Sequence, residues 1–283
     1  MNRIEEIYSV LYKDYEPNYS YMSRVLECKD TQYIPKVSNA GKIITKNGFQ
    51  CQVMHNGILI HEGCYHQAWI TDIIKELKGH HEPQEEKLFY EILKLIPSGG
   101  TMVECGSFWS YYSLWFHSEI KNSKNIMIEP NPLKFELGKL NFKLNNFDGE
   151  FTNSYINNIV EQVSTFTDWD GKQYNIPSIT VDSLFDQYDI DIIDILHADI
   201  QDNEMILLDS ADKALTENKI NYIFLGTHNI NLPIITKLQS YGYHIIESFE
   251  VFQTYFDDGL ILACSPNVIK NINKNKLTVS KRK

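Results

Sequence analysis

The sequence predicts an α/β protein built on a doubly wound, mostly parallel sheet, and three observations lead to this fold class. The segment Thr101–Ser110 (TMVECGSFWS) runs from a short apolar strand through a turn at Gly106 towards an apolar helix. The next strand, Asn125–Ile128, ends at Glu129 and a Pro-Asn-Pro turn. Strand and helix patterns then alternate to about residue 264, which is typical of a parallel sheet. Ligands of such sheets bind at the carboxyl ends of the strands.

The first turn favours a nucleoside cofactor that lacks a diphosphate. A G-x-G-x-x-G pattern counted from Gly106 would need two further glycines, but the chain has Phe108 and Tyr111 at those places. Their side chains keep a pyrophosphate away from the backbone. Glu129 closes the second strand, where an acid can accept hydrogen bonds from ribose hydroxyls. The pattern therefore predicts S-adenosylmethionine as the cofactor and disfavours a nicotinamide dinucleotide.

The chain divides into three predicted parts. Residues 1–78 read as a helical start followed by a small β appendage, with Asn-Gly turns at residues 47–48 and 56–57. This appendage either caps the substrate side or forms a dimer contact, and composition does not choose between them. Residues 79–265 form the main domain. Residues 266–283 are basic and polar, which predicts a flexible tail.

Within the main domain the elements follow in a simple order. A helix at Gln84–Ile96 begins after Pro83, which is tolerated in a first turn. The later predicted elements are a helix at Leu133–Asn145, a third strand at Glu150–Ile156, a hairpin or lid over residues 157–178, a fourth strand at Ile192–Ile200, a helix from residue 202 to 214, a fifth strand at Asn221–Leu225, and an antiparallel pair at Tyr243–Phe249 and Leu260–Cys264.

Composition excludes several classes of function. The chain has 26 basic and 37 acidic residues and a net charge of −11, which disfavours a nucleic-acid groove because phosphate binding uses clustered Lys and Arg. No window approaches ~20 consecutive apolar residues, so we expect no membrane span. The five cysteines form no C-x-x-C pair, and the first residues lack a signal-peptide core. We therefore expect a reduced, cytoplasmic protein.

Five segments occur in a characteristic order: ECGSFWSYYS, IEPNP, LNFKLN, LHADIQDNEMILLDSA and FLGTH. Together they resemble the successive motifs of the FkbM-type S-adenosylmethionine-dependent methyltransferases. The resemblance covers about residues 79–264. It implies a Rossmann-like methyltransferase fold, with a mostly parallel seven-stranded sheet, an antiparallel last strand and helices on both faces. Members of this family methylate hydroxyl groups, often on sugars or polyketide-like natural products.

The resemblance and the strand-end rule together nominate the site residues. We expect the cofactor to contact Glu82, Glu104, Gly106, Ser107, Ser110, Glu129, Asn131 and Ser154. The predicted acceptor contacts are Glu204, Asn229 and Trp169. The predicted catalytic residues are Asp199 and His228, which end the fourth and fifth strands. The chain departs from the family pattern at Glu104, Ser110, His197 and Asp202, where the family usually has Asp, Gly, Lys and Gly.

Methylation of a hydroxyl needs help with its proton. A neutral hydroxyl is a poor nucleophile, so either a base takes the proton as the bond forms or a divalent metal lowers the pKa of the hydroxyl. His228 is the first choice for the base because its unperturbed pKa is about 6.5, and Asp199 would orient it or bind the acceptor. In the alternative, Asp199, His228 and Asn229 would hold Mg²⁺. Four other residues, His55, His61, Cys64 and His66, do not match the paired spacing of a zinc site.

The predicted function is O-methylation of a sugar hydroxyl, in nucleotide-sugar or in surface or capsular polysaccharide biosynthesis. The acceptor is a small molecule or a glycan, and homo-oligomerisation remains open. Two alternatives stand beside this prediction. The departures at Ser110, His197 and Asp202 motivate a methyltransferase-fold binding protein without catalysis. The family resemblance also allows an O-methyltransferase of a non-sugar natural product.

Overall fold

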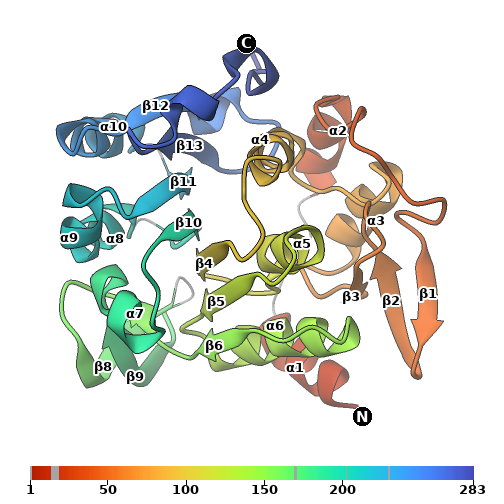
Figure 1. Cartoon of the computed structure of the whole chain (residues 1–283). Helices are drawn as coiled ribbons and strands as arrows, with labels where there is room; N and C mark the ends of the chain where they lie inside the picture. The colour runs from red at the N-terminus through yellow and green to blue at the C-terminus, as the bar shows by residue number, and fades with distance from the viewer. Residues whose placement is uncertain (1, 14–18, 169–170, 202, 229) are drawn as a thin grey trace.

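A seven-stranded sheet forms the centre of the molecule (Figure 1). The computed structural model describes residues 2–13, 19–168, 171–201, 203–228 and 230–283. Its strands lie in the order β12 (His244–Phe249), β13 (Gly259–Cys264), β11 (Ile220–Thr227), β10 (Ile193–Ala198), β4 (Thr101–Cys105), β5 (Lys124–Ile128) and β6 (Glu150–Thr152). The five strands from β11 to β6 are parallel, and β13 pairs antiparallel with both β11 and β12. The predicted fold class, including the antiparallel last strand, is confirmed.

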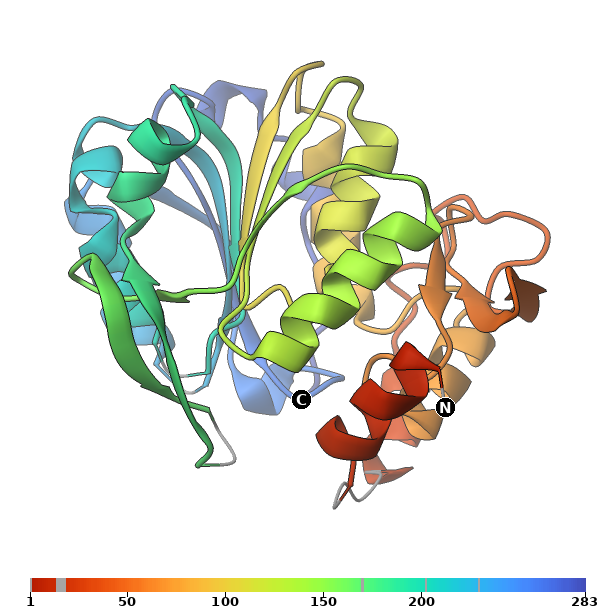
Figure 2. The same cartoon turned by 90° about the horizontal axis from the view of Figure 1, so that it is seen from below.

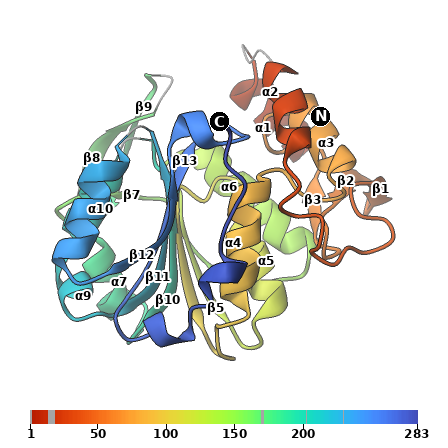
Figure 3. The same ribbon diagram turned by 90° about the horizontal axis from the view of Figure 1, so that it is seen from above.

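Helices cover both faces of this sheet, as the view along it shows (Figure 3). On one face lie α7 (Val181–Gln187), α8 (Glu204–Ser210), α9 (Asp212–Thr216) and α10 (Asn231–Ser240). On the other lie α4 (Pro83–Leu93), α5 (Tyr111–Glu119) and α6 (Pro132–Leu144). Central strands such as β4 and β10 are almost entirely buried, because both of their faces are covered. Two separate apolar cores result, one on each face.

The N-terminal appendage packs outside the α4–α6 layer (Figures 1 and 2). It contains α1 (Arg3–Leu11), α2 (Tyr19–Glu27), α3 (Ala68–Glu76) and an antiparallel sheet of β1 (Ile43–Lys46), β2 (Phe49–Val53) and β3 (Leu59–His61). Ile70 of α3 and Phe89 of α4 belong to the same apolar core. Asn145 at the end of α6 bonds the backbone of Leu59 in both directions, at 2.9 and 2.7 Å. The appendage is therefore built into the main domain and does not form a core of its own.

A smaller sheet stands beside the strand ends. It consists of β7 (Tyr155–Ile156), β9 (Gln173–Ile179) and β8 (Glu161–Thr167), with β8 and β9 paired antiparallel. This is the hairpin expected over residues 157–178. Trp169, the residue of its turn that we nominated for acceptor binding, lies outside the described residues.

The C-terminal tail is packed, in contrast to the flexible tail expected from its composition. It contains two short 3₁₀ turns at Ile269–Asn271 and Lys274–Lys276, and another such turn, Val251–Gln253, follows β12. Leu277 and Val279 are buried, and the Gln84 side chain donates to the Ser280 carbonyl at 2.6 Å. Two buried apolar side chains and hydrogen bonds to the backbone thus fix a segment whose basic, polar composition predicted exposure to solvent. No helix in the described part of the chain is long and apolar enough to span a membrane.

Candidate active site

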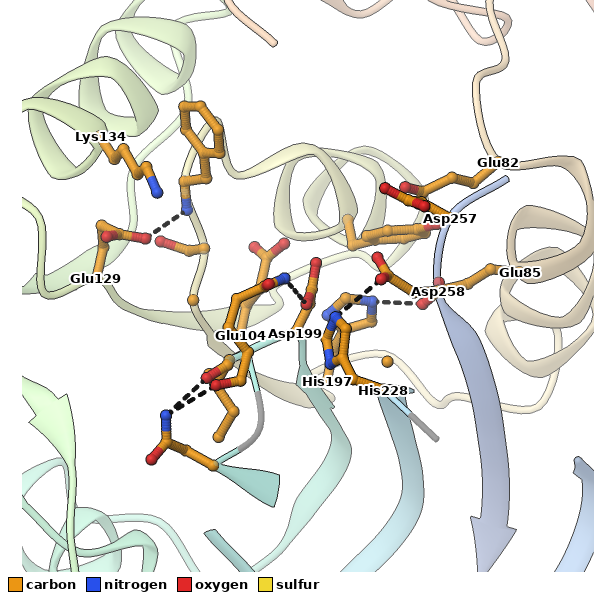
Figure 4. A pocket seen from close by; sticks show the side chains of 18 of the residues that line it. Glu82, Glu85, Glu104, Glu129, Lys134, His197, Asp199, His228, Asp257 and Asp258 are labelled. Carbon is orange, nitrogen blue, oxygen red and sulfur yellow. Dashed lines mark hydrogen bonds and ion pairs between the residues drawn. The ribbon is translucent and has the colours of Figure 1, made fainter. Parts of the chain in front are cut away.

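A cavity of about 1100 Å³ opens at the carboxyl ends of the parallel strands. Pockets for one drug-sized ligand have roughly 300–1000 Å³, so this cavity has room for a cofactor and an acceptor together. Its charged residues fall into two groups (Figure 4). We call the end with Glu129 and Lys134 the Glu129 side, and the end with Glu82, Asp257 and Asp258 the Asp258 side. Asp199 lies between them.

The turn after β4 forms the floor of the Glu129 side. Gly106 has a φ of +73°, and a Cβ there would stand 2.1 Å from the carbonyl oxygen of Asp199. Only glycine fits both restraints. The N–H groups of Gly106 and Ser107 both donate to the Ile128 carbonyl, at 2.9 and 3.1 Å. The turn is therefore fixed against the ends of both neighbouring strands.

Glu129 is held by the backbone on two sides. One carboxylate oxygen accepts the Phe108 N–H at 2.9 Å, and the other accepts the Asn131 N–H at 2.8 Å. Burial raises the pKa of this carboxyl, although Lys134 and these two N–H donors oppose the shift. Each oxygen keeps a further lone pair. The side chain lines the cavity, so it can accept hydrogen bonds from a ligand's hydroxyls.

Glu104 ends β4 almost fully buried. Its carboxylate accepts the Ser113 N–H of α5 at 3.2 Å, and burial raises its pKa to about 7. It also lines the cavity. Glu104 and Glu129, both of which we expected to contact the cofactor, therefore line the same cavity.

On the Asp258 side, His228 sits between two acids. Its Nε2 lies 2.8 Å from Asp258 Oδ1, and its Nδ1 lies 3.7 Å from Glu204 Oε1. These two contacts raise the pKa of His228 to about 11. These contacts favour the protonated imidazole, which makes Asp199 a better candidate for the base than His228.

Asp199 has the opposite character. Burial and the nearby charge of Asp258 raise its pKa to about 8, while the charge of His228 lowers it. Its carboxylate accepts a hydrogen bond from the Gln201 side chain at 3.2 Å. A carboxyl with a pKa near the working pH is suited to accept a proton.

Two more histidines pair with acids along the Asp258 side. His197 Nε2 lies 2.7 Å from Glu85 Oε1, and His81 Nε2 lies 3.2 Å from Glu82 Oε2. Burial works against protonation, but Glu85 outweighs it and raises the pKa of His197. Burial also lowers the pKa of His81, but Glu82 and Glu86 outweigh it and raise this pKa to about 10. The carboxylates of this side are thus largely balanced by fixed histidine cations.

The predicted site residues divide into three groups. Those that line the cavity are Glu82, Glu104, Gly106, Ser107, Glu129, Asp199 and His228. Those described residues that do not line it are Ser110, Asn131, Ser154 and Glu204. Asn229 and Trp169 lie outside the described residues. Glu82 faces Asp257, away from Glu129 (Figure 4), so its place is on the Asp258 side and not with the other residues predicted for the cofactor.

Local contacts explain the residues that turn away. The Ser110 hydroxyl packs against Gly138 of α6, where a Cβ would stand 2.4 Å from it. The Asn131 side chain caps α6 by accepting the Leu133 N–H at 3.0 Å. Ser154 is buried below the surface, and its N–H donates to Thr152 at 3.1 Å. Glu204 does not line the cavity, but its Oε1 atom lies 3.7 Å from Nδ1 of His228, which does.

Among the described residues, two groups of side chains bring metal-ligating atoms together. Asp199, His228 and Asp258 each place one such atom within 4.8 Å of the others. His55, His80 and Glu86 do the same inside the core. The rings of His55 and His80 are stacked at 4.3 Å and 18°, and their lone pairs lie in these nearly parallel planes. One ion cannot lie in both planes at bonding distance, so the first group is the better candidate.

The order of the strands and the cavity at their ends define an α/β protein of the Rossmann-like methyltransferase class. A family model described as Methyltransferase FkbM domain matches residues 97–245. This is more than half of the 283 residues, and the chain therefore belongs to the FkbM methyltransferase domain family. Comparison with curated proteins gives no match.

Solved structures of methyltransferases are similar to this chain at low sequence identity. A precorrin-6Y C5,15-methyltransferase from Geobacter metallireducens GS-15 is 13% identical, with a TM-score of 0.42 over 65% of this chain and 87% of that one. A ribosomal protein L11 methylase from Lactobacillus delbrueckii subsp. bulgaricus is 14% identical, with a TM-score of 0.40 over 66% and 81%. The human methyltransferase 10 domain containing protein is 13% identical, with a TM-score of 0.41 over 65% and 82%.

Several lining residues were missed by the sequence analysis. They are Tyr21, His81, Glu85, Lys134, Phe256, Asp257 and Asp258. Asp257 and Asp258 looked like the polar turn of a hairpin, which the segment between β12 and β13 also is. The available signal was that two acids directly precede the antiparallel strand that neighbours the strand ending at His228.

Proposed function

We propose that this protein transfers the methyl group of S-adenosylmethionine to a hydroxyl of a sugar, in nucleotide-sugar or in surface or capsular polysaccharide biosynthesis in the cytoplasm. The observation that carries the proposal is the single cavity in which Glu129 and the Gly106 turn adjoin Asp199. Membership of a methyltransferase family supports the transfer. The sugar acceptor rests on the resemblance of the sequence motifs.

The residues of the Glu129 side fit S-adenosylmethionine. The Glu129 carboxylate keeps lone pairs for the two ribose hydroxyls. The acidic lining suits a ligand that carries a sulfonium and an ammonium group. Phe108 and Tyr111 occupy the places where a diphosphate would need glycine. When bound, S-adenosylmethionine supplies an electrophilic methyl group. We propose Glu104, Gly106, Ser107 and Glu129 as the residues that hold it.

Asp199 is the proposed proton acceptor. It lies between the two sides of the cavity (Figure 4), where an acceptor hydroxyl must stand about 3 Å from the methyl carbon for in-line attack. The Asp199 carboxylate would take the hydroxyl proton as the oxygen–carbon bond forms and the carbon–sulfur bond breaks, which would leave S-adenosylhomocysteine. Its raised pKa of about 8 makes it a stronger base than an ordinary carboxylate.

His228 has a positioning role in this scheme. As a cation held by Asp258 and Glu204, it donates hydrogen bonds and accepts none. Its charge limits how far the pKa of Asp199 rises. Both ring N–H groups face these two carboxylates, so His228 acts on the site through its charge and by holding Asp258 in place.

A divalent metal is the second candidate for activating the hydroxyl. Asp199 and His228 belong to the predicted Mg²⁺ ligands, and Asp258 supplies the third atom of the group within 4.8 Å. Asn229, the third ligand of the prediction, lies outside the described residues. A bound metal would lower the pKa of the hydroxyl. A ligand set of two carboxylates and one imidazole also suits Mn²⁺ or Zn²⁺.

Calorimetry with S-adenosylhomocysteine, followed by transfer of a labelled methyl group to sugars, tests the proposal. We expect a single site with saturable binding and label recovered on an acceptor oxygen. No binding would contradict the cofactor assignment. Exhaustive dialysis against EDTA separates the two ways of activating the hydroxyl. Full activity is expected if Asp199 acts alone, whereas loss that Mg²⁺ or Mn²⁺ restores would support the metal.

A further inference from the structure

The appendage is fastened to the loop that carries Asp257 and Asp258. The Arg24 guanidinium of α2 donates to the carbonyls of Tyr255, at 3.1 Å, and of Phe256. The Asp257 carboxylate lies close enough to the Tyr21 hydroxyl to raise its pKa. The rings of Trp69 and Phe256 are stacked at 6.1 Å with an angle of 8°. These contacts join α2, α3 and the loop into one wall of the cavity.

This wall offers two kinds of surface to a ligand. Tyr21, Trp69 and Phe256 give it an aromatic border. The carboxylates of Glu82 and Asp257 face one another across its opening, and Asp258 lies below them (Figure 4). Ionised carboxylates only accept hydrogen bonds. Aromatic edges with a few fixed polar groups suit a ligand that has apolar patches and many hydroxyl donors.

No Arg or Lys among the described residues of this wall is directed at the cavity, since the Arg24 guanidinium donates to the Tyr255 and Phe256 carbonyls and does not line it. Recognition of a phosphate uses Arg or Lys forks or free N–H groups at a helix N-terminus. Among the described lining residues, Lys134 is the one Lys or Arg, and it lies on the Glu129 side near Asp168, at 3.9 Å. The histidines of the Asp258 side are already paired with Glu82, Glu85 and Asp258.

The helix that begins at this wall is also closed to anions. The N–H groups of His81 and Glu82, at the start of α4, donate to Glu86 Oε1 at 2.7 and 3.1 Å. The chain's own carboxylate therefore occupies the place where an anion would bind. Glu82 and Glu85 add two negative charges in the same turn.

We propose that α2, α3 and the loop of Phe256, Asp257 and Asp258 form an acceptor subsite for an uncharged, hydroxyl-rich sugar unit, and that this subsite excludes phosphate-bearing acceptors such as nucleotide sugars. The inference rests on the proposed methyl transfer and narrows its substrate class. It assigns the appendage to the substrate side.

Paired acceptors test this inference. A panel of neutral methyl glycosides and the UDP- and GDP-activated forms of the same sugars is offered with labelled S-adenosylmethionine. We expect label in the neutral glycosides, with kcat/KM at least tenfold above that of the matching nucleotide sugar. Equal or higher kcat/KM for the nucleotide sugars would overturn the inference and leave methyl transfer intact. Label in neither set, with S-adenosylhomocysteine still bound, would also overturn it. Loss of that binding would instead contradict the proposed function.

Two substitutions localise the effect to the wall. Asp257→Lys places a cation there on an exposed residue, and we expect the preference for neutral acceptors to fall at least threefold. Asp148→Lys, which changes the same charge on an exposed residue outside the cavity, is the matched control and should leave the preference unchanged. Tyr21→Ala should raise KM for the neutral acceptor severalfold with unchanged affinity for S-adenosylhomocysteine, whereas Tyr21→Phe keeps the ring and should lie between. An unchanged preference in Asp257→Lys would contradict the proposed subsite.

Discussion

The two sides of the cavity are assembled in different ways. Most of the Glu129 side comes from one continuous stretch, residues 101–134, which contains β4, α5, β5 and the start of α6, and Asp168, directly after β8, adds to it. The Asp258 side gathers Tyr21, Glu82, His228 and Asp258, which are spread over almost the whole chain. A local unit can hold a cofactor that many proteins share. The side that must recognise a particular acceptor draws on the appendage and on the segment between the last two strands.

The two sides also differ in how their charges are balanced. On the Glu129 side, backbone N–H groups hold the carboxylate of Glu129. On the Asp258 side, histidines do so, as in the pair of His228 and Asp258. Backbone donors do not titrate, whereas histidine cations do. The raised pKa of Asp199, about 8, makes the acceptor chemistry depend on pH, and the following substitutions test the division between the two sides.

The largest expected effect belongs to Asp199→Asn. Removing the proton acceptor should lower kcat by about 10³-fold, because asparagine cannot take the hydroxyl proton. The dissociation constant for S-adenosylhomocysteine should change little. Single-turnover kinetics and calorimetry measure the two quantities. Asp186→Asn, an exposed carboxylate of α7, is the control. A kcat near the wild-type value would remove Asp199 from the mechanism.

His228→Ala and Asp258→Asn form a pair with opposite expected signs. Burial and Asp258 raise the pKa of Asp199 to about 8, and His228 lowers it. The base is active when deprotonated, so kcat/KM should rise with pH through a midpoint near pH 8 and become constant above it. His228→Ala should cut kcat by ~10²-fold and move this midpoint upward.

Asp258→Asn should move the midpoint downward, because it removes a negative charge close to Asp199. If His228 were itself the base, His228→Ala would abolish the pH-dependent limb instead of moving it. Two midpoints shifted in the same direction would contradict the electrostatic account of the Asp258 side.

Glu129→Gln should affect only the Glu129 side of the cavity, which is the proposed cofactor site. The substitution removes the charged acceptor for ribose hydroxyls, and hydrogen bonds to charged groups contribute about 1.5–3 kcal/mol. We expect the dissociation constant for S-adenosylhomocysteine to rise roughly 10- to 100-fold. At saturating cofactor, kcat should stay within about threefold of wild type. A large loss of kcat at saturation would mean that the two sides are not separate in function.

The smallest expected effect is that of Ser110→Ala. The Ser110 hydroxyl packs against Gly138 and does not line the cavity. The substitution should change cofactor affinity less than twofold, as calorimetry can measure. A tenfold loss would restore Ser110 to the binding site that the sequence pattern suggested.

The sequence could predict most of the Glu129 side of the cavity but only part of the Asp258 side. Glu104, Gly106 and Glu129 follow from one rule, because each stands where a buried strand ends. The same rule found Asp199 and His228 at the ends of β10 and β11. It could not find Asp258, because an acid between two antiparallel strands is also what an ordinary turn requires.

Other errors had local causes. Ser110 and Asn131 lie in the right segments, but each turns to a neighbour in its own unit, Gly138 and the first turn of α6. The raised pKa of His228 could not be foreseen, because it depends on Asp258 and Glu204, two residues from other elements. Proximity in the chain predicts which strand ends meet. It does not predict which charges surround a side chain there.

A crystal structure of the complex with S-adenosylhomocysteine tests the central claim most directly. The account predicts that both ribose hydroxyls bond Glu129 and that the thioether sulfur faces Asp199, which leaves the Asp258 side open. A ligand whose ribose lies among Glu82, Asp257 and Asp258, or whose sulfur points away from Asp199, would contradict it.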